Sequence, residues 1–304
     1  MTIATDIEEH RAHLVGVGYQ MTGSVADAED AVQEAWFRLY RLSDENRAEI
    51  RDIKAWLTTV VSRICLDRLR SAVMRKESYI GPWLPEPLIS SADEDDPLAA
   101  LVLQESVRMA AMVVLERLTP PQRVAFVLHD ALDTPFDEIA EVLGCSTASA
   151  RQHASRARRI VTAEQAPPRA QPAEQQRVLA ALTQALANGD KAALVSLLHP
   201  DAIMVNDSGG MTSAARRIVL GADKVARLLL GLSERYGNDL FAGFAPVIVN
   251  GDPGFRLGGR GGAPESISVL SVRDGRVEAV YSVLNPAKLA RAMPRPPRRP
   301  TPHS

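Results

Sequence analysis

The chain of 304 residues contains only two cysteines, few aromatic residues and a net charge of only −2. Cys65 and Cys145 have no neighbouring residue at metal-ligand spacing, which argues against a metal site and favours reduced structural thiols. No apolar run approaches the roughly 18 residues of a membrane span, and the N-terminal residues lack the apolar core of a signal peptide. We therefore expect a soluble, cytoplasmic protein with no cofactor, no metal and no membrane contact.

The small net charge excludes a strongly basic protein but hides a local segregation of charge. Residues 51–76 and 146–160 are rich in arginine and lysine, whereas residues 27–34 hold acids and no base. A solvated helix face would explain any one of these clusters. Three such clusters in one chain also fit surfaces that bind partners of opposite charge.

Apolar residues recur at helical spacing through residues 7–77 and again through 98–163. Ser24 can cap a helix whose first turns are acidic, and Thr119-Pro120-Pro121 places proline in the first turn of another. The apolar residues of the helix after Ser24 fit a period of 3.6; they are Val25, Ala28, Val32, Ala35, Trp36 and Leu39. A helix beginning at Asp52 is expected to bury Trp56, Leu57, Val60, Val61, Ile64 and Leu69.

The stretch GPWLPEP, Gly81–Pro87, interrupts the helical pattern. Its prolines forbid a regular helix and favour an extended chain, yet Trp83 and Leu84 are too apolar for a plain solvated linker. A proline-rich hinge follows at 167–172, and residues then alternate with period two around Asp274-Gly275, a hairpin signal. We predict domains at 1–78, 98–165 and 174–293, a linker at 79–97, a hinge at 166–173 and a disordered basic tail at 294–304.

Residues 136–161 have the pattern of a helix-turn-helix. Gly144 allows the turn, and small Ala150 and Ala154 would let the second helix cross the first closely. The outward and flanking side chains could read base edges or hold phosphates. They are Ser149, Arg151, Gln152, His153, Arg156, Arg158 and Arg159. The alternative is a pair of helices with a basic surface and no nucleic acid.

The motif blocks DAEDAVQEAWFRLYR and AWLTTVVSRICLDRLRS resemble the sigma-2 domain of extracytoplasmic-function (ECF) sigma factors, and LERLTPPQRVAFVLHDALDTPFDEIAEVLGCSTASARQHASRARR resembles their sigma-4 domain. The resemblance implies two all-α domains that bind core RNA polymerase and promoter DNA. Polymerase would contact Asp27, Asp30, Gln33, Glu34 and Trp36. The −10 element would contact the loop 46–53 and Lys54, Trp56, Arg63, Asp67, Arg68 and Arg70. The helix 147–159 would read the −35 element. Many family members have asparagine where Arg63 stands, so a base preference is not carried over at this position.

The third predicted domain, 174–293, which we call the third module, resembles the SnoaL-like domain fused to one subgroup of these factors. That domain is a curved α+β cone around a pocket. The subgroup's signatures appear here as Trp83, Leu84, Pro85, Glu86 and Pro87; as Asp207, Ser208, Gly209, Gly210 and Met211, with Met211 in place of lysine; and as Asn285, Pro286, Ala287, Lys288 and Leu289. The resemblance implies regulation in cis, with Trp83 and Leu84 docked on the third module. We expect Trp83 to be largely buried there; it could instead cap only the first domain.

Two other functions are compatible with parts of the sequence. The third module could be an enzyme using His199, Asp201 and Asp207 as acid or base, although HPD after a helix and Asp207 before Ser-Gly-Gly also suit turns. The chain could also be a one-component DNA-binding regulator, which would leave its first half unexplained. A small molecule in the pocket of the third module is possible under any of these functions, and we expect a monomer when the protein is free.

Overall fold

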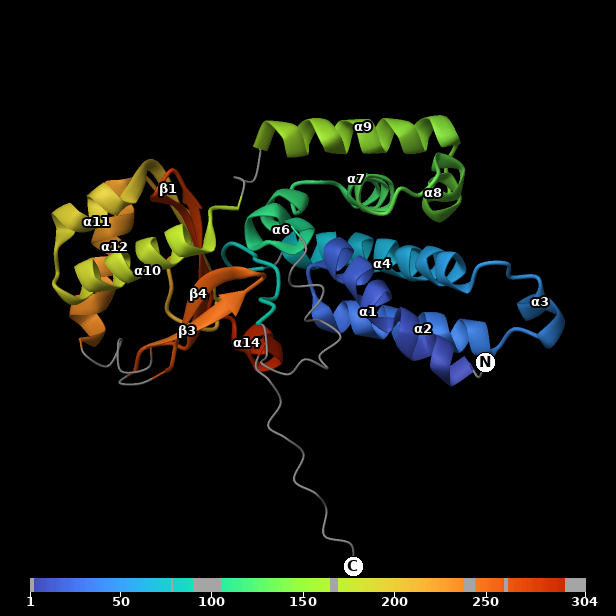
Figure 1. The fold of residues 1–304 in the computed structure, drawn as a ribbon, viewed down its shortest axis with the longest axis horizontal. Coiled ribbons are helices and arrows are strands. Elements are labelled where there is room, and N and C mark those ends of the chain that lie inside the picture. Colours follow the sequence, from blue (N-terminus) through green and yellow to red (C-terminus); the bar gives the residue numbers. More distant parts are fainter. Residues whose placement is uncertain are drawn as a thin grey trace, which may run out of the picture.

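The computed structural model describes residues 3–77, 79–89, 105–164, 169–237, 244–259 and 262–292. A helical lobe and a lobe built on a sheet lie side by side, joined where the chain segment 79–89 passes between them (Figure 1). We call residues 3–77 the first module, 105–164 the second module and 169–292 the third module. The acidic run at 93–96 and the basic tail expected at 294–304 lie outside the described residues.

The first two modules are built of helices, as predicted, and one of these, at 44–48, runs into the expected loop 46–53. The helices are α1 (Ile3–Thr22), α2 (Val25–Tyr40), α3 (Asp44–Ala48), α4 (Ile53–Glu77), η1 (Glu105–Val107), α6 (Met109–Leu115), α7 (Pro120–Phe126), η2 (Val127–Ala131), α8 (Phe136–Leu143) and α9 (Thr147–Glu164). The hydroxyl of Ser24 accepts the N–H of Asp27 at 3.2 Å, which confirms the predicted cap of α2. Gly144 ends α8 with a φ of 66°, the left-handed conformation that the predicted turn requires.

The third module is a curved sheet with most of its helices on one face. Its elements are α10 (Pro172–Ala187), α11 (Lys191–Leu197), β1 (Leu198–Asp207), β2 (Val219–Leu220), α12 (Ala222–Tyr236), β3 (Phe244–Val249), β4 (Asp252–Leu257), β5 (Ser266–Arg273), β6 (Arg276–Val283) and α14 (Pro286–Ala292). The strand order is β2-β1-β6-β5-β4-β3, with β1 and β6 parallel and the other pairs antiparallel. The predicted hairpin joins β5 to β6 through Asp274 and Gly275, which have φ values of 50° and 71°.

Both faces of the central strands β5 and β6 are buried, although period-two alternation is usually typical of a strand with one solvated face. On the inner face, Leu270, Val272 and Val280 pack under α10, α11 and α12. On the outer face, alternate residues such as Val269 and Tyr281 join a separate apolar cluster. The outer cluster also contains Leu84 from the linker, Met109 and Ala110 from α6, and Leu289 from α14. The linker, α6 and α14 therefore form a second layer, over the outer face of the sheet.

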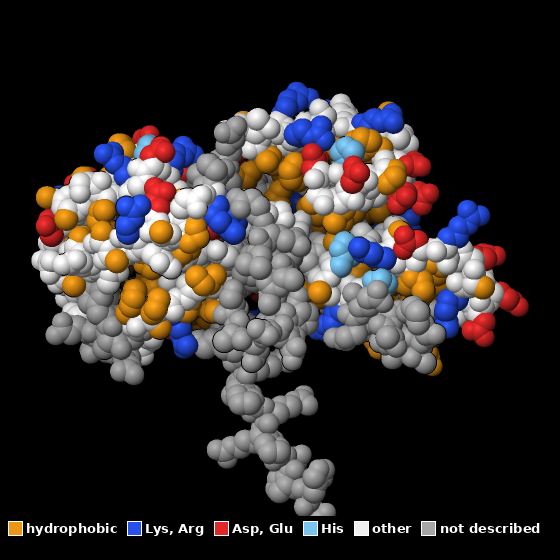
Figure 2. Space-filling model, viewed as in Figure 1, with side chains coloured by type: hydrophobic (Ala, Val, Ile, Leu, Met, Phe, Trp, Pro, Cys, Tyr) orange, Lys and Arg blue, Asp and Glu red, His pale blue; other side chains and the backbone are white. Residues whose placement is uncertain are grey.

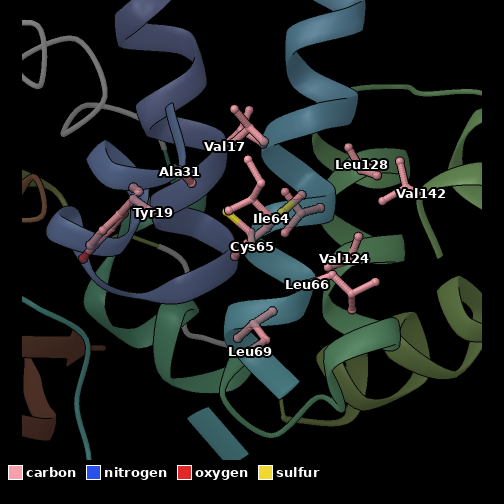
Figure 3. Close-up of a cluster of buried hydrophobic side chains, with 14 of the residues drawn as sticks. Val17, Tyr19, Ala31, Ile64, Cys65, Leu66, Leu69, Val124, Leu128 and Val142 are labelled. Carbon is pink, nitrogen blue, oxygen red and sulfur yellow. The ribbon is translucent and has the colours of Figure 1, made fainter. Parts of the chain in front are cut away.

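The first and second modules share one continuous apolar core. Helix α4 lies between them, packed on α1 and α2 on one side and on α7 and α8 on the other. Figure 3 shows Leu66 of α4 beside Val124, with Leu128 and Val142 following along the same interface. Burial of these apolar side chains holds the two helical modules together in a closed arrangement.

The structure corrects two local expectations. Trp56 was expected to be buried, but it is only partly buried at the edge of the shared core because it lies in the first turn of α4. The sequence His199-Pro200-Asp201 lies within β1 instead of forming a turn, and the pairing of β1 with β6 shifts register between Leu198 and Ile203. Within the described residues, no helix has both the length and the apolar character needed to cross a bilayer.

Candidate functional site

Helix α9 presents the predicted base-reading residues to solvent. Ser146 caps the helix by accepting the N–H of Ser149 at 3.2 Å. Ala150 and Ala154 are buried, as predicted, and their small side chains let α9 lie close to α7 and α8. The exposed side chains are Arg151, Gln152, Arg156, Arg158 and Arg159, while Ser149 and His153 are partly buried. Figure 2 shows lysine and arginine side chains along the upper edge of the molecule, where α9 lies.

Some of these side chains already have partners on the same module. Arg158 Nε lies 2.9 Å from Asp130 Oδ1, and this hydrogen bond raises the pKa of the guanidinium. The guanidinium of Arg151 lies over the Phe136 ring, 5.5 Å from its centroid. Burial, followed by the charge of Arg156, lowers the pKa of His153. At neutral pH the basic face is therefore formed by arginines and not by histidine.

Helix α4 presents Lys54, Arg63, Asp67 and Arg70 to solvent. Arg70 and Asp67 pair with each other at 3.2 Å. Arg63 reaches across to the second module: its Nη2 donates to the carbonyl of Glu141 at 3.3 Å and lies 3.7 Å from the Glu141 carboxylate. A residue expected at the −10 element thus contacts α8, the first helix of the helix-turn-helix.

The acidic helix α2 is partly engaged within its own module. Arg68 lies 3.1 Å from Asp27 and 3.6 Å from Asp30, which joins a predicted −10 residue to two predicted polymerase contacts. Glu34 pairs with Arg38 one turn further along the helix, and Gln33 is exposed. Trp36 is partly buried, and no described residue accepts a hydrogen bond from its buried Nε1.

The linker docks on the third module through Leu84 and Asp207, both of which are 0% exposed. The N–H of Leu84 donates to Oδ2 of Asp207 at 2.9 Å. Lys288 lies 2.6 Å from the same carboxylate oxygen and also donates to the carbonyl of Leu84. The hydroxyl of Tyr79 donates to Oδ1 of Asp207 and accepts from Asn285 at 2.9 Å. We call this group, Tyr79, Leu84, Asp207, Asn285 and Lys288, the Asp207 anchor.

Trp83 is partly buried between two modules, and it meets the third module in the predicted Asn285–Leu289 segment as well as the first module. Lys288 Nζ lies 3.9 Å from the centroid of its ring, which is cation–π geometry. The far edge of the ring meets the turn between α1 and α2, where a Cβ added at Gly23 would lie 2.8 Å from Cη2 of Trp83. Its neighbour Leu84 is the fully buried side chain of the linker and packs on the outer face of the sheet. The two side chains differ in burial because neighbouring side chains of an extended chain point to opposite sides.

Glu86 ties the linker to the first module. Its carboxylate accepts from the hydroxyl of Ser24 at 3.0 Å and from the N–H of Val25 at 2.8 Å, at the N-terminus of α2. Its N–H donates to the carbonyl of Gly23 at 2.8 Å. The same carboxylate lies 3.2 Å from Arg291 of α14, so one side chain bridges two modules. Pro85 and Pro87, on either side, are also buried.

The two glycines after Asp207 are explained by close approach of the linker. Gly209 and Gly210 have φ values of 58° and 75°. A Cβ at Gly209 would lie 2.8 Å from Nδ2 of Asn285, and one at Gly210 would lie 2.9 Å from Ile80. Leu289 belongs to the outer apolar cluster. Pro286 is exposed and starts α14, so its role is local.

A second anchor, which the sequence reasoning missed, lies at the turn between β3 and β4. Asn250 accepts the N–H of Leu88 at 3.0 Å and donates to Val107 and to Tyr19, at 2.6 and 3.0 Å. Asp252, at the start of β4, lies 2.9 Å from Arg108 of the second module. Two further groups reach Asp252, namely Arg169 at 3.0 Å and Gln175 at 3.2 Å. The sequence signal here was Asn-Gly, which indicates a tight turn but not the contacts of its side chain.

The acid–base cluster that the alternative enzyme function would require does not assemble in the third module. His199 and Asp201 lie at the start of β1, while Asp207 lies at its other end with its carboxylate in the linker anchor. Asp207 is therefore neither beside the other two residues nor a turn starter. Within the described residues, no group of histidine, cysteine and carboxylate side chains has the arrangement of a metal site.

Comparison with known proteins agrees with this arrangement. Residues 7–73 match the family described as Sigma-70 region 2, and residues 108–161 match Sigma-70, region 4. The ECF RNA polymerase sigma factor SigJ of Mycobacterium tuberculosis is 51% identical, over 93% of this chain and 92% of its own length. The probable ECF RNA polymerase sigma factor SigI of the same organism is 33% identical, over 92% of each chain.

A crystal structure of SigJ, 48% identical, superposes with a TM-score of 0.79 and covers 94% of this chain and 98% of that one. The likeness thus extends through both helical modules, the linker and the third module. The chain belongs to the extracytoplasmic-function sigma factors of bacterial RNA polymerase.

Proposed function

We propose that the third module regulates this sigma factor in cis, by holding its two promoter-reading modules in a closed arrangement that must open before initiation. In the open state α4 and residues 46–53 read the −10 element, and α9 reads the −35 element. The acidic face of α2 binds core RNA polymerase. The protein therefore acts in the cytoplasm, where polymerase and promoter DNA are found.

The contact between Arg63 and Glu141 carries this proposal. The two promoter elements are named for positions about 25 base pairs apart, which is roughly 85 Å of duplex at ~3.4 Å per base pair. Helix α4 packs directly on α7 and α8 in the closed protein. Two reading surfaces on one shared core do not span that distance, so the modules have to separate on the promoter.

The linker gives the third module control over this separation. Residues 79–89 are held to the third module by the Asp207 anchor and by Asn250, and to the first module by Glu86. The second module is held by Arg108 on Asp252. Because these contacts lie within one chain, even weak contacts are mostly formed, at an effective concentration that is roughly millimolar for a short tether.

A reversible cross-link tests the proposal. Arg63→Cys and Glu141→Cys are combined in a Cys145→Ser background and joined with a bismaleimide that contains a reducible disulfide. Cys65 should not compete, because burial raises the pKa of its thiol to about 12. We expect the cross-linked protein to support no promoter-specific transcription with core polymerase, and reduction to restore it.

The two single-cysteine variants, treated with the same reagent, serve as controls: the transcription that each supports should be the same before and after reduction. Equal transcription before and after reduction of the double variant would mean that initiation takes place in the closed arrangement, and the proposal would then be wrong.

A further inference from the structure

A cavity of about 80 Å³ lies inside the third module, between α10, α12 and the inner face of the sheet. Its walls are almost entirely apolar and include Leu182, Met204 and Leu229, with Phe244 and Phe255 stacked at a centroid distance of 5.5 Å. A single water needs roughly 10–15 Å³, so the cavity is several times larger than one hydration site. None of the described residues that line it is ionisable.

Asn206 supplies an unsatisfied polar group in this wall. The side chain is 6% exposed and lines the cavity, and no described residue accepts a hydrogen bond from its Nδ2. The nearby hydroxyls of Ser268 and Ser282 bond to each other at 2.8 Å and so are already partnered. Buried amide donors in native proteins are rarely left unpaired, because the lost hydration is not replaced.

Asn206 is also the sequence neighbour of Asp207. Successive residues of a strand face opposite sides of the sheet, so Asn206 faces the cavity while Asp207 holds the linker on the outer face. The end of strand β6 also connects the cavity with Asp207. Leu284, just beyond this end, lines the cavity and donates its N–H to the carbonyl of Asp207 at 2.7 Å. One pair of strands thus carries the cavity on one side and the Asp207 anchor on the other.

We propose that the cavity is an effector site for a small, neutral, mostly apolar molecule with one carbonyl oxygen, which accepts a hydrogen bond from Nδ2 of Asn206. The absence of lining charge disfavours ionic ligands, since a buried charge needs a partner. Because Asn206 and Asp207 are neighbours on one strand, a ligand that fixes Asn206 also steadies the Asp207 anchor, and it therefore favours the closed arrangement and lowers transcription. The regulatory half of this inference rests on the proposed function.

Cyclopentanone and cyclopentane form a matched pair of probes, alike in shape and different in the carbonyl. Binding to the full-length protein and its variants is followed by the methyl NMR signals of Leu182, Met204 and Leu229, which line the cavity. We expect saturable binding of the ketone, roughly five- to tenfold tighter than that of the hydrocarbon, the range that one net hydrogen bond provides. In Asn206→Leu this preference should vanish, while Ser196→Ala, outside the cavity, should retain it. Equal binding of both probes, or no binding by either, overturns the site.

Hydrogen exchange at the Leu84 amide then tests the coupling without polymerase, because that amide is bonded to Asp207. The ketone should slow its exchange in the natural protein and not in Asn206→Leu. Ketone binding with unchanged exchange at Leu84 overturns the coupling. Slower exchange with unchanged transcription supports the effector site and counts instead against the proposed closed-state regulation.

Discussion

Lys288 Nζ lies 2.6 Å from Oδ2 of Asp207, and the two side chains are 9% and 0% exposed. Burial lowers the pKa of Lys288, while the charge and hydrogen bond of Asp207 oppose that shift. The subgroup's Asp207–Met211 motif ends in lysine, and the residue at that position here is Met211, which is exposed. The positive charge next to Asp207 therefore comes from a different motif, on α14.

Breaking this ion pair should loosen the linker. Lys288→Met leaves a buried carboxylate without its cation, and removal of one partner of such a pair costs about 3–5 kcal/mol. Urea unfolding should show this loss of unfolding free energy. Transcription with core polymerase should rise when the variant and the natural protein are compared at equal concentrations of folded protein. The exposed pair Lys191–Asp223 provides the control, because Lys191→Met should change stability little. The double variant Asp207→Asn, Lys288→Met should lose less than the sum of its single changes; strict additivity would contradict the pairing.

Gly23→Ala should displace Trp83. The left-handed conformation at φ 69° costs an alanine about 1–2 kcal/mol, and the contact with the indole should add about 1–3 kcal/mol. Gly189→Ala is a matched control, because its φ is 65° and nothing lies within 4 Å of the added Cβ. In a Trp36→Phe, Trp56→Phe background, Trp83 fluorescence should shift to the red for Gly23→Ala alone. An identical spectrum in both variants would show that Trp83 does not pack on this turn.

Substitutions on α9 should distinguish the residues that read bases from those that contact the DNA backbone. Arg151→Ala or Gln152→Ala should relax preference at one or two base pairs of the −35 element and cost about 1–3 kcal/mol at the preferred base. Arg159→Ala should weaken binding to all sequences about equally, because phosphates are the same at every position. Transcription from a randomised −35 library measures both effects. Indistinguishable sequence profiles for the three variants would mean that α9 holds only the backbone.

The stability of the first module should fall as pH drops from about 6.5 towards 4. Burial, with smaller contributions from Lys54 and His10, lowers the pKa of His13 from 6.5 to about 4. Between these values the unfolded chain binds a proton that the folded chain does not, so acid favours unfolding. His13→Gln should flatten the dependence of the unfolding free energy on pH in this window. Parallel curves for the variant and the natural protein would assign the dependence to other groups.

Much of the helical half could be predicted from sequence because its signals are local. The Ser24 cap, the Gly144 turn and the inward Ala150 and Ala154 follow from rules that concern a few neighbouring residues. The closed packing of α4 on α8 could not be predicted in the same way. An apolar residue such as Leu66 fits a helix facing its own module equally well, and periodicity does not identify the partner.

The contacts of the linker could also be predicted from the sequence only in part. Motif resemblance placed Asp207, Asn285 and Lys288 in one region and docked both Trp83 and Leu84 there, but it did not show that Leu84 is fully buried and Trp83 only partly. Asn250 carried only a turn signal, and Tyr79 carried none, although both bind the linker or the anchor directly. Hydrogen bonds between residues more than a hundred positions apart depend on the final packing, and a single sequence does not record that packing.

The covalent linker also fixes the stoichiometry of control. Each molecule of this sigma factor carries its own restraining module, at a ratio that gene dosage does not alter. Under the proposed regulation, a cell that makes more of the protein obtains more closed and more open molecules in the same proportion. Overproduction does not exhaust the restraint, as it would exhaust a separately encoded inhibitor. The response to expression level should therefore be graded and without a threshold, and only a change in the anchors or the cavity should move the balance.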